Sequence, residues 1–223
     1  LASTLNNLGA LAMYEDQVAE AHDYFVRALV IKEQALGPDH SDLCSTLNNL
    51  GAVALKEQNP EQAQAYLERA LAIQEKSTGS EDSSLVAPLV NLGEVLASGG
   101  KHEQALVHQQ RALALLEAGQ NPEHPMFVLV LCGLAETLLA LDRAAEALPH
   151  AERALVLEQR NQARSSLARI DFILARVLWE LQPDAGRDRA RARTLAEQAA
   201  ASYREAGDPS HSSEVQAWQA AHP

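Results

Sequence analysis

Apolar residues recur with helical spacing through most of the chain. Leu5, Leu8 and Ala12 follow one another at intervals of three and four residues, and Ala21 and Phe25 continue the pattern farther on. These intervals bring side chains to one face of an α-helix. Turn-forming residues bound each such stretch. The pattern therefore predicts a succession of short amphipathic helices joined by brief turns.

The helical pattern repeats with a period of 42 residues. The string LNNLGA at 5–10 returns at 47–52, and related strings follow at 90–94 and 133–136. The motif RAL recurs with the same spacing of 42 residues, so its arginines form a column of equivalent positions: Arg27, Arg69, Arg111 and Arg153. A column of small residues, Gly9, Gly51 and Gly93, permits close approach of two helix backbones. Several columns with one period predict an array of structural repeats.

Each unit is expected to form a hairpin of two helices. Turn-forming residues interrupt the units at Asp16, Asn59–Pro60, Gly99–Gly100 and Asp142, and the linkers lie at 37–40, 79–82 and 121–125. One hairpin cannot bury both of its faces, so the units are expected to stack. A fifth, degenerate unit carries extra residues in QPDAGRDR at 182–189. The segment 210–222 is predicted to form a capping helix, with Val215 and Trp218 facing inward.

These columns resemble the tetratricopeptide repeat (TPR), whose first helix carries Leu-Gly and whose second helix carries two alanines seven residues apart. The 42-residue unit, with N-N-L-G, R-A-L and a G-P-D-H linker, is similar to the kinesin-light-chain type. The resemblance covers residues 1–207 and implies an all-α fold, a right-handed α-solenoid of about five helical hairpins plus a C-terminal capping helix. The predicted organisation is one solenoid over 1–223, with repeats at about 1–39, 40–81, 82–123, 124–161 and 162–207.

A narrower likeness concerns the Ala/Arg-rich end of the chain. The strings ARVLWE, RARARTLAEQA and EVQAW are similar to the C-terminal TPR regions of bacterial Ser/Thr protein kinases. The chain begins at Leu1 rather than Met, so we expect a fragment of a longer protein. The likeness implies that a kinase domain precedes it.

The TPR resemblance also implies that the first helices line a concave groove that holds a peptide or a partner helix. The predicted groove residues are Asn6, Asn7, Tyr14, Asn48, Asn49, Asn91, Glu94, Glu136, Arg169, Arg176 and Trp179. The groove is expected to be rich in Asn and Ser at its N-terminal end, acidic in the middle, and rich in Arg and aromatic residues at its C-terminal end.

Several of these positions have two interpretations. The amides of Asn6 and Asn48 match the donor and acceptor of a peptide bond, yet they also suit hydrogen bonds across the seam between helices. Glu94 and Glu136 either attract a basic ligand residue or are solvated carboxylates. Trp179 either anchors a ligand or packs beneath the terminal cap.

Two further interpretations concern side chains near these positions. Phe172 is expected to pack beneath the cap. The RAL arginines are expected to cover neighbouring alanines or to pair with glutamates of their own helix.

Composition narrows the choice of partner. The formal net charge is −12, which disfavours nucleic acid and anionic membrane surfaces. No stretch of about 20 apolar residues exists to span a membrane. With only two cysteines and no secretory signal, the chain is expected in a reducing, cytoplasmic compartment. The likeness to bacterial Ser/Thr protein kinases implies that the cell is bacterial.

The search for catalytic motifs favours a non-enzyme. Gly99-Gly100-Lys101 lacks the first Gly and the Ser/Thr of a phosphate-binding loop, and the histidines are scattered. We expect no cofactor, no metal site and no catalytic residue. The predicted function is a protein-interaction module that recruits a substrate or regulator to an attached domain, such as a Ser/Thr kinase. The alternative is a structural module that forms a weak homo-oligomer.

Overall fold

The computed structural model describes residues 1–119, 121, 124–160, 166–182 and 186–222. These residues form α-helices and one short 3₁₀ turn, and they contain no strand. The helices are α1 (Ala2–Tyr14), α2 (Val18–Leu36), α3 (Leu43–Lys56), α4 (Pro60–Thr78), α5 (Val86–Ser98), α6 (His102–Ala118), α7 (Met126–Ala140), α8 (Ala144–Arg160), α9 (Leu167–Glu180), α10 (Arg189–Glu205) and α11 (Pro209–Ala221), with the 3₁₀ turn η1 at Ser83–Leu85.

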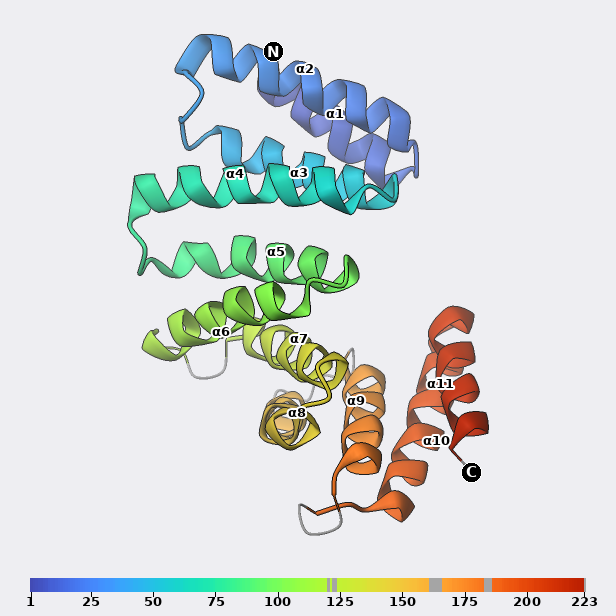
Figure 1. Cartoon of the computed structure of the whole chain (residues 1–223). Coiled ribbons are helices and arrows are strands. Elements are labelled where there is room, and N and C mark those ends of the chain that lie inside the picture. The colour runs from blue at the N-terminus through green and yellow to red at the C-terminus, as the bar shows by residue number, and fades with distance from the viewer. Residues whose placement is uncertain (120, 122–123, 161–165, 183–185, 223) are drawn as a thin grey trace. The chain divides into compact units, whose positions relative to one another are not determined.

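The contacts divide the chain into two compact units, Leu1–Gly119 and Gln120–Pro223. In the first unit, the hairpins α1/α2, α3/α4 and α5/α6 stack in order, because α2 packs on α3 and α4 packs on α5 (Figure 1). The second unit contains the hairpins α7/α8 and α9/α10, with α8 against α9 and α11 against α10. The predicted all-α fold of helical hairpins is confirmed.

Some expected boundaries remain predictions. The repeat boundaries at 123/124 and 161/162 touch residues outside the described ranges, as does the 183–185 portion of the QPDAGRDR segment. A single solenoid over 1–223 also stays a prediction. Helix α11 occupies nearly the segment expected for the cap, and it buries Val215 fully and Trp218 partly.

One turn geometry closes four successive hairpins. The residues with positive φ at these turns are Asp16 (60°), Gln58 (58°), Gly100 (75°) and Asp142 (58°), and they are 42 residues apart. The amide of the following residue reaches back to a carbonyl five residues earlier, as in Asn59 N to Ala54 O at 2.8 Å. This pattern satisfies carbonyls at the end of the first helix, and it places a left-handed residue where glycine fits best.

The predicted glycine column lies where two helices of one hairpin meet. A Cβ atom on Gly9 would lie 2.7 Å from the Phe25 ring, and one on Gly51 would lie 2.9 Å from Leu67. Both distances are too short for carbon atoms to approach without movement. The absence of a side chain at these positions therefore sets how closely the two helices pack.

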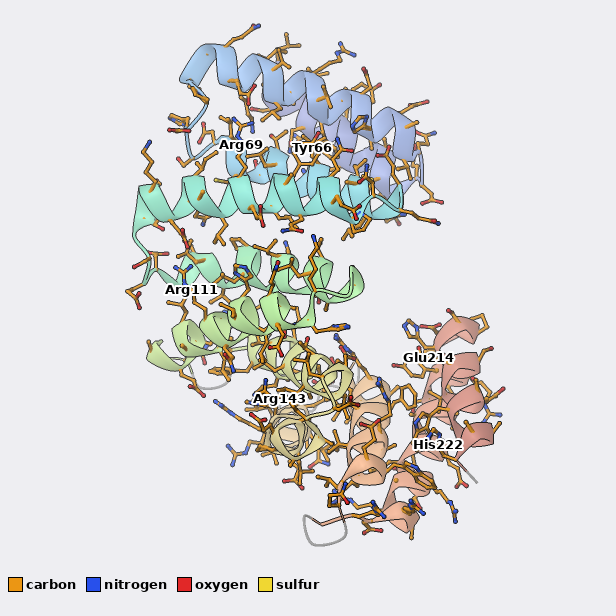
Figure 2. The ribbon with its side chains drawn as sticks, viewed as in Figure 1. Tyr66, Arg69, Arg111, Arg143, Glu214 and His222 are labelled. Atoms are coloured by element: carbon orange, nitrogen blue, oxygen red, sulfur yellow. The ribbon has the colours of Figure 1, made fainter. Side chains whose placement is uncertain are left out.

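The RAL arginines correct one expectation. Arg69 on α4 pairs with Glu33 of α2 at 2.6 Å, and Arg111 on α6 pairs with Glu75 of α4. Figure 2 labels the two arginines. The prediction of pairing within one helix is wrong for both, because each side chain extends to the second helix of the preceding hairpin. Arg27 on α2 does pair within its own helix, with Asp23 at 3.1 Å.

The shared turn geometry gives a matched pair of substitutions. We expect Gln58→Gly to raise the free energy of unfolding by about 0.5 kcal/mol, because glycine relieves a left-handed strain of about 1 kcal/mol and loses part of that gain to unfolded-state entropy. The reverse change at the equivalent turn, Gly100→Gln, is expected to lower it by about 1 kcal/mol. Urea unfolding followed by circular dichroism measures both, and shifts of the same sign would contradict the strain argument.

Candidate functional site on the first helices

The N-terminal asparagines lie at the seam between the first two hairpins. The Oδ1 atom of Asn6 accepts a hydrogen bond from the Thr46 hydroxyl at 3.0 Å and one from Asn49 Nδ2 at 3.5 Å. Thr46 is fully buried, and its hydroxyl accepts from Lys32 Nζ at 2.9 Å. The network joins α1, α2 and α3. Asn6 and Asn49 thus have a structural role at this seam.

Asn48, one period after Asn6, has a different environment. Pro88 occupies the position equivalent to Thr46, so no hydroxyl is present there to donate to the amide oxygen. Among the described residues, the Oδ1 atom of Asn48 is buried and has no hydrogen-bond partner. Leaving a buried acceptor unpaired costs about 1–3 kcal/mol. Of Asn6 and Asn48, only Asn6 therefore uses its amide oxygen in a hydrogen bond between the hairpins, as far as the described residues show.

The side chain of Asn48 borders a surface pocket in the first unit. The pocket has a volume of about 200 Å³ and lies between α3 and α5, with α4 contributing to its wall. Its lining residues are Asn48, Ala52, Leu55, Leu67, Asn91, Glu94 and Val95. Three of the predicted groove residues, Asn48, Asn91 and Glu94, thus meet at one place, together with apolar side chains.

Two predicted residues on α1 lie outside this pocket. Tyr14 is 89% exposed at the end of the helix. Asn7 is also exposed, and it is not part of the pocket lining. Both side chains therefore stay predictions as groove residues.

In the second unit, two predicted groove residues pair with each other. Arg169 of α9 donates from Nε to Glu136 Oε1 of α7 at 2.9 Å, and its Nη2 atom donates to Oε2 at 2.5 Å. Such a two-point contact fixes both the distance and the orientation of the two groups. The charges that were expected as separate acidic and basic features of the groove therefore neutralise each other and hold α7 to α9.

The aromatic end of the predicted groove packs beneath α11. The ring of Trp179 meets the edge of Trp218 at a centroid distance of 5.7 Å, and Phe172 meets the same ring at 6.0 Å. Arg189 lies over the Trp179 ring at 4.6 Å. These contacts favour the packing interpretation for Trp179 and agree with the one expected for Phe172.

Arg176 lies on the same helix as these two aromatic residues. Its guanidinium lies 5.8 Å from the centroid of the Phe172 ring, within the range of a cation–π contact. Arg176 is half-buried, so part of its side chain stays accessible on α9.

Metal ligation, membrane insertion and thiol reactivity each depend on particular features of the described residues. No group of three His, Cys, Asp or Glu side chains among them is arranged to hold a metal ion. None of the helices in the described ranges combines the length and apolar character that crossing a membrane needs. Burial raises the pKa of the Cys132 thiol to about 12, and burial also raises that of Cys44. Both thiols therefore stay protonated near neutral pH, where only a thiolate acts as a nucleophile.

Comparison with protein families identifies the repeat. The model described as "Tetratricopeptide repeat" matches residues 1–76 and 84–160, which is more than half of the chain. The chain belongs to the tetratricopeptide repeat family. Comparison with curated proteins gave no match.

Solved TPR structures share the fold at low sequence identity. A putative kinesin light chain from Podosopora anserina, with nearly identical TPR-like repeats, is 23% identical with a TM-score of 0.72, covering 89% of this chain and 93% of that one. BtubC (BKLC) from P. vanneervenii is 19% identical with a TM-score of 0.68, covering 74% and 65%. YrrB, described as a TPR protein with an unusual peptide-binding site, is 18% identical with a TM-score of 0.57, covering 89% and 84%. At these identities the similarities show a shared fold.

The Glu136–Arg169 contact is expected to stabilise the second TPR unit. A double-mutant cycle with Glu136→Gln and Arg169→Met should give a coupling free energy of about 1 kcal/mol, because both side chains are only about a third exposed and the contact has two points. The matched control is the exposed pair Asp23–Arg27, for which the same cycle should give less than about 0.5 kcal/mol. Equal coupling for the two pairs would contradict this prediction.

The buried thiols are expected to be unreactive in the folded TPR units. At pH 8 iodoacetamide should label neither Cys44 nor Cys132, because their raised pKa values and burial leave almost no accessible thiolate. In 8 M urea both should be labelled, and mass spectrometry counts the adducts. Labelling of Cys132 in the folded protein at a rate close to that in urea would show that α7 opens readily.

Proposed function

We propose that this TPR chain is a protein-interaction module that binds a peptide segment of a partner on the face of its first helices, with the pocket between α3 and α5 as a specificity site. The pocket carries the proposal because Asn48, Asn91 and Glu94 meet there beside apolar side chains. The TPR family supports the coarser function of binding proteins or peptides.

The amides of the pocket suit a peptide backbone. Asn48 has a buried oxygen with no partner in the described part of the chain, and Asn91 is exposed beside it. A peptide N–H that reached Asn48 after a rotation of its amide would supply the missing hydrogen bond. Asparagine also donates, so one side chain can hold both polar groups of a peptide bond. Extended peptides are commonly bound through their backbones in this way.

The size and charge of the pocket indicate which side chains it accepts. Its volume of about 200 Å³ is below the 300–1,000 Å³ typical of small-molecule sites, which favours one peptide side chain over a cofactor. Leu55, Leu67 and Val95 make the wall apolar. Glu94 brings a carboxylate to the same pocket, and the chain as a whole carries −12. We therefore expect a small apolar residue next to Lys or Arg in the ligand.

Two finer parts of the function rest on likeness alone. YrrB is described as having a peptide-binding site, which supports peptide binding by analogy. Recruitment of a substrate or regulator to an attached domain, such as a Ser/Thr kinase, follows from the sequence likeness of the C-terminal end and stays a prediction. The bacterial source and cytoplasmic location stay predictions as well.

A random-peptide display library tests the proposed site. Peptides selected on the wild-type protein are expected to carry a basic residue beside a small apolar one. They should bind the Asn48→Leu and Glu94→Gln variants about tenfold more weakly, because each variant removes a polar contact from a desolvated site. Fluorescence polarisation with a labelled selected peptide measures the dissociation constants.

The matched control is Gln34→Leu, which changes an exposed amide on α2 outside the pocket and should leave the affinity unchanged. Equal affinities for the wild type, Asn48→Leu and Glu94→Gln would remove this pocket from the binding site. The alternative of self-association has a separate readout. Sedimentation velocity at rising concentration would show a dimer that none of the pocket variants disrupts.

A further inference from the structure

One polar side chain lies buried in an otherwise apolar column of the second helices. The column consists of Phe25, Leu67, Gln109 and Ala151, which follow one another at the period of the repeat and are 1–3% exposed. Three of these side chains are apolar and suit a hydrophobic core, whereas Gln109 on α6 brings a primary amide to the same place. Apolar packing therefore accounts for the other three residues and leaves the amide of Gln109 unexplained.

Gln109 packs against α5 as Leu67 packs against α3. A Cβ atom on Gly51 of α3 would lie 2.9 Å from Leu67 Cγ, and one on Gly93 of α5 would lie 2.8 Å from Gln109 Cγ. Leu67 also lines the pocket between α3 and α5. Gln109 thus occupies, one hairpin farther along the first unit, the position from which Leu67 reaches the pocket.

The amide oxygen of Gln109 has no hydrogen bond. Among the residues that the structure describes, its Oε1 atom is buried and lacks a partner. Val90 and Ala97 of α5, one period after Asn48 and Leu55 of the pocket, carry no side-chain donor. A buried oxygen without a hydrogen bond lowers the stability of the fold, and native proteins pair most such atoms. The unpaired oxygen therefore points to a donor supplied by a ligand.

We propose that Gln109 is a second contact for the peptide that occupies the pocket, and that its amide oxygen accepts a hydrogen bond from an N–H group of that peptide. This inference rests on the proposed function, because the pocket positions the peptide. The donor is a main-chain N–H or the N–H of an Asn, Gln or Lys side chain, and either one supplies the missing bond. Asn48 and Gln109, whose buried oxygens lack partners in the described chain, then bind one ligand at two points.

The stacking of the hairpins sets the distance between the two contacts along the peptide. Gln109 on α6 lies one hairpin beyond Leu67 on α4, and packed helices are about 8–10 Å apart. One hairpin therefore corresponds to about 10–20 Å, whereas an extended peptide rises by about 3.3 Å per residue. We expect the donor about three to six residues away from the residue that enters the pocket.

The substitution Gln109→Leu separates a binding role from a packing role. It introduces the residue that the preceding hairpin has at this position, so we expect a higher midpoint of urea unfolding, because an unpaired amide then leaves the core. The same variant should bind the peptides selected from the display library about tenfold more weakly in fluorescence polarisation, because a hydrogen bond in a desolvated site is lost. A residue that serves packing alone would not lose affinity while the fold becomes more stable.

The neighbouring residue provides the matched control. Gln110→Leu makes the same change at the next position of α6, where the side chain is exposed. It should leave the peptide affinity unchanged. A loss of affinity in Gln110→Leu equal to that in Gln109→Leu would contradict the proposal, because added apolar character on α6 would then explain both results.

Changes in the peptide identify the donor. In one series each main-chain N–H of a selected peptide is methylated in turn, and in a second series Lys is replaced by norleucine and Asn or Gln by leucine. One change is expected to weaken binding to the wild type about tenfold and to leave binding to Gln109→Leu unchanged, because that variant no longer accepts the bond. The series that contains this change shows whether the donor belongs to the main chain or to a side chain.

The outcomes distinguish this proposal from the proposed function. If Asn48→Leu weakens binding and Gln109→Leu does not, the second contact is overturned and the pocket stands. If Gln109→Leu weakens binding and the pocket variants do not, the contact at Gln109 stands and the pocket is removed. No binding of any selected peptide at about 100 μM overturns both. A lower urea midpoint for Gln109→Leu, or no coupled change in either peptide series, also overturns the contact at Gln109.

Discussion

The structure depends on the fact that one hairpin leaves an apolar face of its first helix uncovered. In the first unit, the second helix of each hairpin covers that face in the next hairpin, as α2 does for α3. The contact includes specific polar interactions as well as apolar packing, because Lys32 binds Thr46 and Arg69 binds Glu33 across it. Each hairpin therefore stabilises its neighbour, and stability accumulates along the array rather than residing in any one hairpin.

The period explains why so much of the fold was predictable from sequence. A contact that is made once per repeat leaves the same residue type at the same phase, as with Gly9 and Gly51 or the turns at Asp16 and Asp142. The positions of helices and turns follow from such columns without any knowledge of long-range contacts. The partner of Arg69 did not follow, because a column gives the phase of a residue and says nothing about which neighbouring helix lies within its reach.

The candidate site was less predictable because it depends on differences between repeats. Asn6 and Asn48 are equivalent positions of successive repeats, yet Asn6 accepts from Thr46, whereas Asn48 Oδ1 has no partner within the described part of the chain, where Pro88 replaces the threonine. The difference between Thr46 and Pro88 at equivalent positions of two repeats thus decides whether the neighbouring asparagine is a structural group or a candidate binding group. Glu136 and Arg169 are 33 residues apart, and only the packing of α9 against α7 brings their charges together.

The aromatic cluster beneath α11 determines what tryptophan fluorescence reports. The chain has two tryptophans, and Trp179 and Trp218 are in contact with each other and with His222 at the end of α11. Emission intensity and wavelength therefore report the packing of α9, α10 and α11. Circular dichroism follows every helix. A difference between the two signals during unfolding would separate the loss of the C-terminal cap from the loss of the remaining hairpins, without any added label.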